Sequence, residues 1–525
     1  MRRRGATSVT AIAFSVLTGG CVTVGPDFET PEADVAEAWQ QAQDQRISAG
    51  QGDYSEWWAS FNDPALQSLV QQAFDQNKTL QIAGLRVFEA RAIVGVAVGN
   101  LYPQLQRASG SAGRIKISEN ADLISGLPGP VRNDIDTTFQ DYRVGFDAAW
   151  ELDFWGRFRR NVEFADANLA ASIATYDDVL VTLAGEVAAA YIILRTLEER
   201  LGVAEANVAI QQRSLEISEV RNRNQLTTEL DPQIARAFLR DTQATIPPLK
   251  AGIRQVRNAL CVLVGKVPGE LDPLLGSAGT IPNAASEAAI GVPAELLRRR
   301  PDIRQAELQA AAQSARVGVA VADLYPAFGL TGTIGFAADS TGSVFESDSQ
   351  RGLGTFGFSW NILNYGRIRS RIRAEDARLQ QAITNYQETV LRAAREVEDA
   401  TADFIAAQEE AAFFEDGTAA ALRAVDLSLV QYREGTADFT RVLDAQRLLL
   451  AQQDGLTQAR GKHARSVVAI YKALGGGWEN RSLDNLVPEA MKQEMQDRTK
   501  WGNLLDAEAV EPVPAEERGT WRAPD

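Results

Sequence analysis

GVAVGNLYPQL (residues 95–105) and GVAVADLYPAF (residues 318–328) are nearly the same eleven residues, and they begin 223 positions apart. Seven of their first nine residues are identical. The similarity extends to flanking residues, since NKTLQIA at Asn77 aligns with RPDIRQA at Arg300 by the same shift. The chain therefore contains two copies of one unit of roughly 200 residues, which is too long for a solenoid repeat.

The residues after each repeated string change from helical to strand periodicity. Before the first string, PALQSLVQQAFDQNKTLQIAGLRVFEARAIVGVAV places apolar residues at helical spacing. After it, DYRVGFDAAWELDFW (residues 141–155) alternates, with apolar residues at even positions and charged residues at most odd ones. This length and pattern are typical of a transmembrane β-strand that has one face towards lipid and the other towards water.

Four strands are expected in each chain. The second copy supplies AFGLTGTIGF and LGTFGFSWNIL, which predict a hairpin at about 327–363. The first copy predicts a hairpin at about 104–154, and its first strand is poorer, with Leu105, Ile115 and Ile117 as its clearest apolar residues. We expect a strand there mainly because its repeat counterpart is one. The polar, turn-rich segments between paired strands are expected to be external loops.

The prolines of the two strings stand where a helix is expected to end and a strand to begin. Pro103 and Pro326 cannot continue a helix, and a proline favours extended geometry in the residue before it. Tyr102 and Tyr325 are expected near the membrane interface, where aromatic side chains are favoured. A repeated helix-to-strand junction of a soluble protein is the alternative for this pattern.

A second alignment, shifted by 210 residues, joins WELDFWGRFRRNVEFADANL to WNILNYGRIRSRIRAEDARL. Both segments contain a Gly-Arg pair where the strand is expected to end and a helix to begin, at Gly156–Arg157 and at Gly366–Arg367. From each pair onwards about 67 residues contain no proline, as far as about Arg223 and Arg433. A continuous helix of that length spans roughly 100 Å and reaches most of the way across the periplasm.

The strand number implies an oligomer. Four strands cannot close a barrel, and an open sheet edge is not tolerated in lipid. Three chains that give four strands each make a twelve-stranded barrel, an even number within the known range. A pore that several chains share, continued by long helices, is a conduit.

Composition excludes several classes of function. The net charge of −16 argues against nucleic-acid binding. No uninterrupted apolar run reaches the roughly 18–20 residues of a membrane-spanning helix, so an inner-membrane helical protein is not expected. With two cysteines and one histidine, neither a His/Cys metal site nor a cofactor is expected. The histidine, His463, is expected on a solvated helix face, and no catalytic constellation supports an enzyme.

The N-terminus is typical of an export signal. MRRRGATSVTAIAFSVLTGGC contains three arginines, a short apolar stretch and small residues before Cys21. This pattern predicts a lipoprotein signal over residues 1–20 and acylation of Cys21, which anchors the chain to outer-membrane lipid. Ordinary secretion is the alternative, since Thr18 stands where a lipoprotein signal usually has leucine.

Several motifs together resemble the TolC-like outer-membrane efflux family, in its OprM/NodT lipoprotein branch. They are CVTVGPDFETP at Cys21, WWASFNDPALQSLV at Trp57, GVPAELLRRRPDIRQAE at Gly291, NALCVLVGKVPG at Asn258 and YREGTADFTRVLDAQRLLLAQQ at Tyr432. The resemblance runs from Cys21 to about Leu474. The acidic tail beyond it, ending EPVPAEERGTWRAPD, has a composition typical of disorder.

The resemblance implies an α+β membrane protein: a homotrimer with a twelve-stranded transmembrane β-barrel, continued by a long periplasmic α-helical barrel. It divides the chain, after the signal, into an N-terminal equatorial segment, a first repeat, an equatorial link, a second repeat and a C-terminal equatorial segment with the tail. Their expected ranges are 21–60, 61–264, 265–295, 296–474 and 475–525.

The resemblance also implies a gate at the periplasmic helix tips. Asp438 matches the acidic position of the second tip and is the first candidate for a ring that favours cations. Asp444 is a second candidate, and Glu229 and Asp231 in the first tip are weaker ones. A helix-capping or solvated role is the alternative for these residues.

Such proteins are passive exit ducts of tripartite efflux systems. The implied partners are a periplasmic adaptor and an inner-membrane pump of the resistance-nodulation-division type, and the implied cargo is small molecules such as drugs. Two alternatives stay open: a duct for protein or peptide (type I) secretion, and a non-conducting structural lipoprotein that spans the periplasm.

Overall fold

The computed structural model describes residues 22–48, 50, 54–118, 128, 130, 136–275, 279–294, 299–479 and 485–506. The expected signal segment 1–20, the acylation site Cys21 and the tail from 507 onwards lie outside the described residues. Most of the first expected external loop lies outside them as well.

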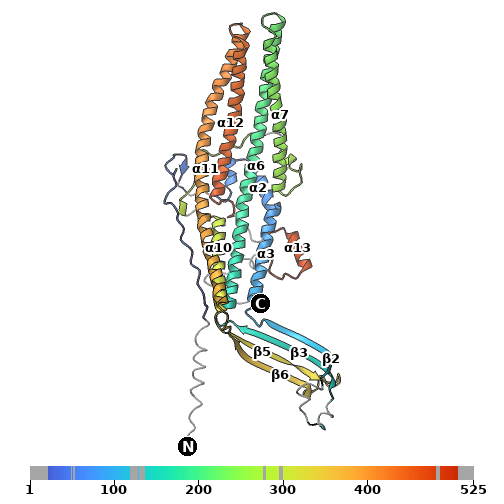
Figure 1. Ribbon diagram of the computed structural model, residues 1–525. Coiled ribbons are helices and arrows are strands. Elements are labelled where there is room, and N and C mark those ends of the chain that lie inside the picture. Colours follow the sequence, from blue (N-terminus) through green and yellow to red (C-terminus); the bar gives the residue numbers. More distant parts are fainter. Residues whose placement is uncertain are drawn as a thin grey trace.

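The two copies fold into matching units that lie side by side along one axis (Figure 1). The first unit contains α2 (Pro64–Gln76), α3 (Lys78–Gly99), β2 (Leu105–Lys116), β3 (Thr138–Leu152), α6 (Arg157–Arg223) and α7 (Leu230–Leu263). The second contains α10 (Pro301–Ala322), β5 (Ala327–Ala338), β6 (Gln350–Ser359), α11 (Arg367–Arg433) and α12 (Phe439–Ala473). A short α13 (Glu489–Arg498) follows. The sheet lies at one end of the molecule and the helix tips at the other.

The two long helices are the longest elements. Both α6 and α11 contain 67 residues, which corresponds to roughly 100 Å at 1.5 Å per residue. Each is preceded by a glycine in the left-handed region, Gly156 with φ 77° and Gly366 with φ 82°. Glycine enters this region without the steric cost of a Cβ, so the chain can turn sharply from strand to helix at these positions. The Gly-Arg pairs therefore mark the start of both helices.

The four long strands form one antiparallel sheet in the order β2-β3-β5-β6. The register places Val144 opposite Phe336, and Leu330 opposite both Trp150 and Phe356. The residues of this set share one face, which we call the apolar face. Many of its side chains are exposed, including Phe146, Ile334, Phe356 and Phe358. An apolar surface of this extent is unusual on a soluble protein and indicates that something apolar covers it.

The opposite face of the sheet, which we call the polar face, carries charged and hydroxyl side chains. Asp147 lies opposite Arg107 and Thr333, and it accepts a hydrogen bond of 2.9 Å from the Thr333 hydroxyl. The strand expected on the ground of the repeat is present as β2. Leu105 and Ile115, its clearest apolar residues, lie in register with the polar face, opposite Ala149 and Phe139. On the apolar face, the middle of β2 carries the small residues Ala108, Gly110 and Ala112, opposite bulkier residues of β3.

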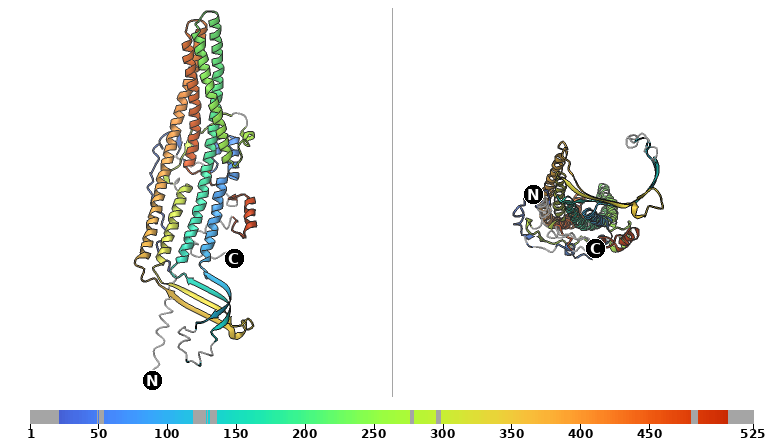
Figure 2. Two further views of the ribbon diagram at one scale, coloured as in Figure 1. Left: turned by 45° about the vertical axis from the view of Figure 1, so that its right-hand side comes forward. Right: turned by 90° about the horizontal axis from the view of Figure 1, so that it is seen from below.

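The edges of the sheet are open within one chain. Among the described residues, β2 pairs with β3 alone and β6 with β5 alone. Figure 2 shows, from below, that the sheet curves rather than lying flat. A curved sheet with two unpaired edges has the form of one sector of a barrel.

The main core lies at the middle of the helices. It contains Trp57, Phe88, Tyr191 and Phe404, and the two-residue strands β1 (Ile47–Ser48) and β4 (Ala288–Ala289) pair in parallel nearby. Cys261 is buried in this core, as expected. The α6 helix contains an 18-residue window that is apolar enough on average to cross a membrane, and 61% of that window is buried inside the fold. Its apolar residues are core residues.

His463 also departs from expectation. It packs against the Phe404 ring at 5.2 Å and lies 3.1 Å from the Gln408 amide, between α11 and α12. Burial lowers the pKa of His463 below its ordinary value. The single histidine is therefore a partly buried packing residue and not a solvated one.

The N-terminal segment explains why Gly318 stands in the second repeat string. A Cβ on Gly25 would lie 2.4 Å from the Gly318 Cα, so the two backbones meet where neither has a side chain. Beside them the buried Arg160 side chain donates to the carbonyl oxygens of Val24 and Gly25, and it pairs with Asp27 at 2.7 Å. A Cβ on Gly95, the first-copy counterpart, would meet nothing within 4 Å. The described N-terminal segment is therefore held by Arg160 of the first copy and by the close approach to Gly318 of the second.

Candidate functional site

The tips of the two helical hairpins contain all four gate candidates. Asp438 is the N-cap of α12, where its carboxylate accepts a hydrogen bond of 3.3 Å from the Arg441 backbone N–H. Asp444 is exposed on α12, six residues after Asp438. Glu229 precedes α7 and accepts a hydrogen bond from the Gln233 amide at 3.1 Å. Asp231 lies in the first turn of α7 and is partly buried.

One candidate joins the two hairpins. The Tyr432 hydroxyl, at the end of α11, donates to the Asp231 carboxylate at 3.1 Å. Arg221, at the end of α6, donates to the carbonyl oxygens of Tyr432 and Arg433 at 2.8 and 2.9 Å. Its guanidinium also lies over the Tyr432 ring, 4.8 Å from the centroid. We call Arg221, Asp231 and Tyr432 the tip latch, since they connect the α6–α7 hairpin to the α11–α12 hairpin.

The tip latch is built to stay closed at ordinary pH. Burial and the neighbouring Asp231 charge raise the pKa of Tyr432 to about 12, so its hydroxyl remains a donor. The Arg221 guanidinium also satisfies carbonyl groups at the C-terminal end of α11, where a cation is favoured by the helix dipole. An apolar cluster that includes Leu215, Phe238 and Phe439 packs beneath it. The contacts therefore lie on a rigid support.

The structure does not bring the four candidates together within one chain. Only Asp231 belongs to the tip latch; Asp438 caps its own helix, and Asp444 and Glu229 make no contact with the other candidates among the described residues. Arg221 and Tyr432 were missed from the sequence. The available signal was a basic residue in the last turn of α6, a common helix-end pattern with no specific meaning by itself.

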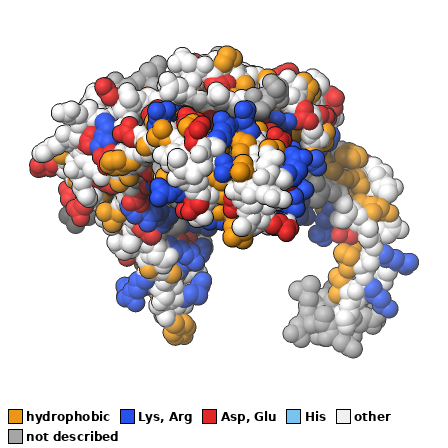
Figure 3. All heavy atoms as spheres, turned by 90° about the horizontal axis from the view of Figure 1, so that it is seen from above, with side chains coloured by type: hydrophobic (Ala, Val, Ile, Leu, Met, Phe, Trp, Pro, Cys, Tyr) orange, Lys and Arg blue, Asp and Glu red, His pale blue; other side chains and the backbone are white. Residues whose placement is uncertain are grey.

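The tip end carries mixed charge. Figure 3 looks down on this end and shows Lys and Arg side chains interspersed with Asp and Glu. Beside the tip latch lies a groove of about 910 Å³, lined by residues of α6 such as Glu216, Ile217 and Val220. Leu226 and Leu230, next to it in the first tip, are both 63% exposed. One protomer therefore presents apolar and charged groups at the tip that it does not cover itself.

The two copies of the repeat make equivalent contacts at the sheet end of the molecule. The Trp150 indole donates to the Leu101 carbonyl at 3.1 Å, and its counterpart Trp360 donates to the Leu324 carbonyl at 2.9 Å. The two leucines belong to the repeated LYP strings, so each tryptophan ties a strand end to a helix-to-strand turn. These turns hold four of the expected junction residues.

Those junction residues lie at the surface beside the sheet. Tyr102 and Tyr325 are 51% and 39% exposed. Tyr325 stacks on Trp155 at 4.5 Å, and the Trp155 indole donates to the Pro326 carbonyl at 2.9 Å. Pro103 stands in the corresponding first-copy turn, between the end of α3 and the start of β2. The geometry forms a band of aromatic side chains at the helical end of the strands.

The described part of the chain offers no metal centre: no group of three or more His, Cys, Asp or Glu side chains within it is arranged to hold an ion. The groups that stand out are therefore the two sheet faces, the open edges and the tip latch.

Comparisons with known proteins agree with this arrangement. Residues 69–266 and 292–476 match the model of the outer membrane efflux protein family. The solvent efflux pump outer membrane protein SrpC of Pseudomonas putida is 31% identical over 487 residues, with 88% of this chain and 97% of that protein covered. Nodulation protein T of Rhizobium leguminosarum bv. trifolii is 28% identical over 480 residues, covering 90% and 98%. The solved structure of the outer-membrane channel OprN superposes with a TM-score of 0.79 at 34% identity, covering 87% and 99%.

Proposed function

Because the chain belongs to the outer membrane efflux protein family, we propose that three copies form one exit duct that carries small molecules out of the periplasm. Outer membrane localisation follows from the family and its relatives. The observation that carries the proposal is the curved four-stranded sheet, which has one apolar face, one polar face and two open edges. A single protomer cannot place such a sheet in lipid.

A trimer would remove the open sheet edges that a single protomer leaves. If β6 of one protomer pairs with β2 of the next, three sheets close into a twelve-stranded barrel without edges. The apolar face then contacts lipid, and the polar face, with Arg107, Arg143 and Asp147, lines a water-filled lumen. The long helices continue this lumen into the periplasm as a helical barrel, for which their length of roughly 100 Å is sufficient.

We also propose that this trimer has a gate at the tips of its helical hairpins. The tip latch holds the two hairpins of each protomer together, and Asp438, exposed at the second tip, supplies one carboxylate per protomer to a ring around the axis. Three carboxylates facing one another favour cations and resist anions. Asp444 lies further along its helix, and Asp231 is engaged with Tyr432, so Asp438 is preferred over both. Glu229 stays a weaker candidate in the first tip.

The N-terminal segment supports acylation at Cys21. The Val24 N–H donates to the Trp155 carbonyl at 3.1 Å, and Arg160 holds the following residues. Val24 thus lies at the helical end of the sheet, and Cys21 precedes it by three residues in the sequence. Acyl chains attached there would enter the inner leaflet of the outer membrane.

A duct of this kind needs partners because it contains no energy source. We propose a periplasmic adaptor, docked at the tips, and an inner-membrane pump of the resistance-nodulation-division type. Similarity to a solvent efflux pump protein, SrpC, favours small molecules over secreted proteins. The polar face argues against a non-conducting structural role, since such a role needs no charged lumen.

The duct and its gate ring are tested by single-channel recording of the purified trimer in planar bilayers. We expect a small, cation-preferring conductance from the wild type. Asp438→Asn keeps the helix cap, because asparagine caps as well as aspartate, but removes the charge, and we expect it to lose most of the cation preference. Asp75→Asn, an exposed aspartate on α2, is the matched control and should leave selectivity unchanged. Unchanged selectivity in Asp438→Asn would move the gate ring elsewhere.

A further inference from the structure

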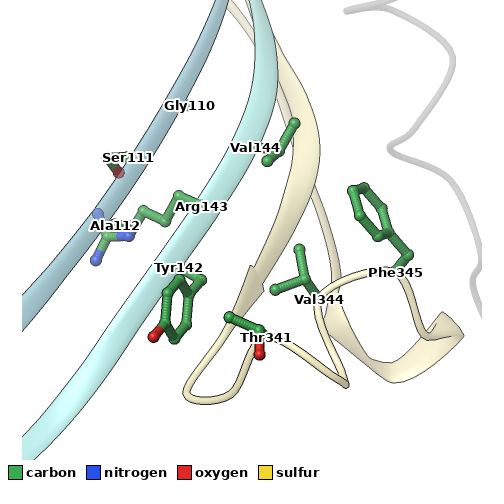
Figure 4. Close-up of a pocket in the computed structure, with 9 residues that line it drawn as sticks. All are labelled: Gly110, Ser111, Ala112, Tyr142, Arg143, Val144, Thr341, Val344 and Phe345. Atoms are coloured by element: carbon green, nitrogen blue, oxygen red, sulfur yellow. The ribbon is translucent and has the colours of Figure 1, made fainter.

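A cavity of about 460 Å³ lies on the sheet, near the end that is remote from the helices. Its walls come from β2, β3 and the loop after β5; Figure 4 shows Tyr142 and Val144 on one side and Thr341, Val344 and Phe345 on the other. We call it the outer groove. None of the residues discussed as gate, latch or junction belongs to it.

The outer groove opens on the apolar face of the sheet. Phe345 contacts the Phe336 ring at 5.6 Å, and Phe336 lies opposite Val144 on that face. The floor is low because β2 contributes Gly110 and Ala112, which leave space beside the larger Tyr142 and Val144. The groove is therefore an apolar slot whose depth comes from two small residues.

The loop that forms the other wall is fixed by its own contacts. The Ser349 hydroxyl donates to the Ser343 carbonyl at 2.7 Å, and the Glu346 N–H donates to the same carbonyl at 3.1 Å. Val344 is 6% exposed, whereas Phe345 next to it is 73% exposed. A buried residue thus anchors the loop, and an aromatic side chain is left at the mouth of the groove for a ligand to cover.

Two cations stand beyond the groove on the same face. Arg114 lies opposite Gln140 and Lys116 opposite Thr138, both in register with Ala112 and Tyr142. Arg114 is two residues beyond Ala112, a rise of about 7 Å along the strand. Both side chains are exposed, and neither makes a hydrogen bond or ion pair with another described residue. The slot is apolar and its outer rim is positive.

We propose that the outer groove binds one acyl chain of a phosphorylated glycolipid of the outer leaflet, with Arg114 and Lys116 contacting its phosphate. The inference rests on the proposed function, because the barrel orientation turns the apolar face towards lipid and the strand ends remote from the helices towards the exterior. A lipid with an anionic phosphate above its chains matches an apolar slot with cations at its outer end. A peptide or a second protomer is less suited to this site, because neither brings an acyl chain for the mostly apolar lining together with a phosphate for the two cations.

The test uses purified trimer stripped of lipid, titrated with lipid A (a bisphosphorylated, multiply acylated disaccharide) and followed by native mass spectrometry. Arg114→Ala combined with Lys116→Ala should weaken lipid A binding roughly thirtyfold, since each of the two cations near an anionic surface contributes on the order of 1 kcal/mol. Gly110→Leu should weaken it similarly by filling the slot. A Cβ at Gly110 would meet only the Arg143 carbonyl, at 3.8 Å, so this change does not strain the sheet.

Gly113→Leu is the matched control. Gly113 lies on the same strand but in register with the polar face, opposite Asp141, and its added Cβ would meet nothing within 4 Å. It should leave lipid A binding unchanged. Equal binding by all variants, or equal binding of phosphatidylglycerol and lipid A by the wild type, would overturn the proposal.

Conductance recorded on the same preparations separates this inference from the proposed function. A conducting trimer that does not bind lipid A would refute lipid binding in the outer groove but leave the proposed exit duct intact. A trimer whose variants bind lipid A with the expected differences but that never conducts would refute the exit duct and support lipid binding in the outer groove.

Discussion

Arg221→Ala should open the tips. The change removes two hydrogen bonds to the end of α11 and the contact with the Tyr432 ring, and so releases one hairpin from the other. Hydrogen bonds from a charged donor contribute about 1.5–3 kcal/mol each, so losing even one of them shifts a closed-to-open equilibrium at least roughly tenfold. We expect cells with this variant to take up a large antibiotic that the wild type excludes. The measurement is the minimal inhibitory concentration of vancomycin.

Two further variants make this prediction specific. Arg223→Ala removes a neighbouring exposed arginine that makes no contact with another described residue, and it should leave uptake unchanged. Tyr432→Phe removes only the hydrogen bond to Asp231 and should have a smaller effect than Arg221→Ala. If Arg221→Ala and Arg223→Ala behave alike, the tip latch does not control the opening.

Among the substitutions discussed, Glu198→Gln should cause the largest loss in the free energy of unfolding. Glu198 is almost fully buried and accepts hydrogen bonds from Arg195 at 2.7 Å, from Arg257 at 2.8 Å and from the Gly279 N–H at 3.1 Å. Through Gly279, Glu198 holds the segment between the two copies (residues 265–295) against α6. Removing its charge leaves the buried Arg195 without a carboxylate partner, while Arg257 keeps Asp272, and breaking a buried pair in this way costs about 3–5 kcal/mol. We expect a marked fall in the thermal unfolding midpoint of the trimer, measured by circular dichroism.

The pH dependence of this effect follows from the Glu198 pKa. Burial alone would raise it, but the hydrogen bonds from Arg257 and Arg195 lower it below the ordinary value. A lowered folded-state pKa stabilises the fold above the unfolded-state pKa, and this contribution is lost as the pH falls through the folded-state value. The difference between wild type and Glu198→Gln should therefore be full at neutral pH and shrink in strong acid.

Asp272→Asn is the control for this substitution. Asp272 pairs with the same Arg257 at 3.1 Å, but its side chain is 61% exposed. Exposed ion pairs contribute about 0–1 kcal/mol, so the unfolding midpoint should change little. Equal losses from both substitutions would show that burial does not set the strength of this network.

The repeat made the elements of this fold predictable, because periodicity and proline placement act locally. Alternation in β3 and the proline-free runs after Gly156 and Gly366 correspond to the observed strand and to both 67-residue helices. The faces of β2 were not predictable, since Leu105 and Ile115 are its most apolar residues yet lie in register with the polar face. Cross-strand register is a tertiary property that single residues do not reveal.

The functional groups were predictable only in part, for a similar reason. Asp231 was a weak candidate from its position in the first tip, and the structure gives it the contact with Tyr432. Arg221 and Tyr432 are 211 residues apart in sequence, and nothing local marks either as a partner of the other. Arg160 and Gly318 likewise gain their role only when the N-terminal segment folds back over them.

Cysteine accessibility on β3 tests the central claim, that the two sheet faces separate lipid from a water-filled duct. Native Cys261 is buried and does not compete for reagent. With purified trimer in lipid vesicles, Arg143→Cys and Asp147→Cys should react with a charged, water-soluble thiol reagent, whereas Val144→Cys and Phe146→Cys should not. Reaction at Arg143→Cys and Asp147→Cys alone is the result that a lumen lined by the polar face requires. Equal reaction at all four positions, or reaction at the apolar-face positions alone, would contradict the duct.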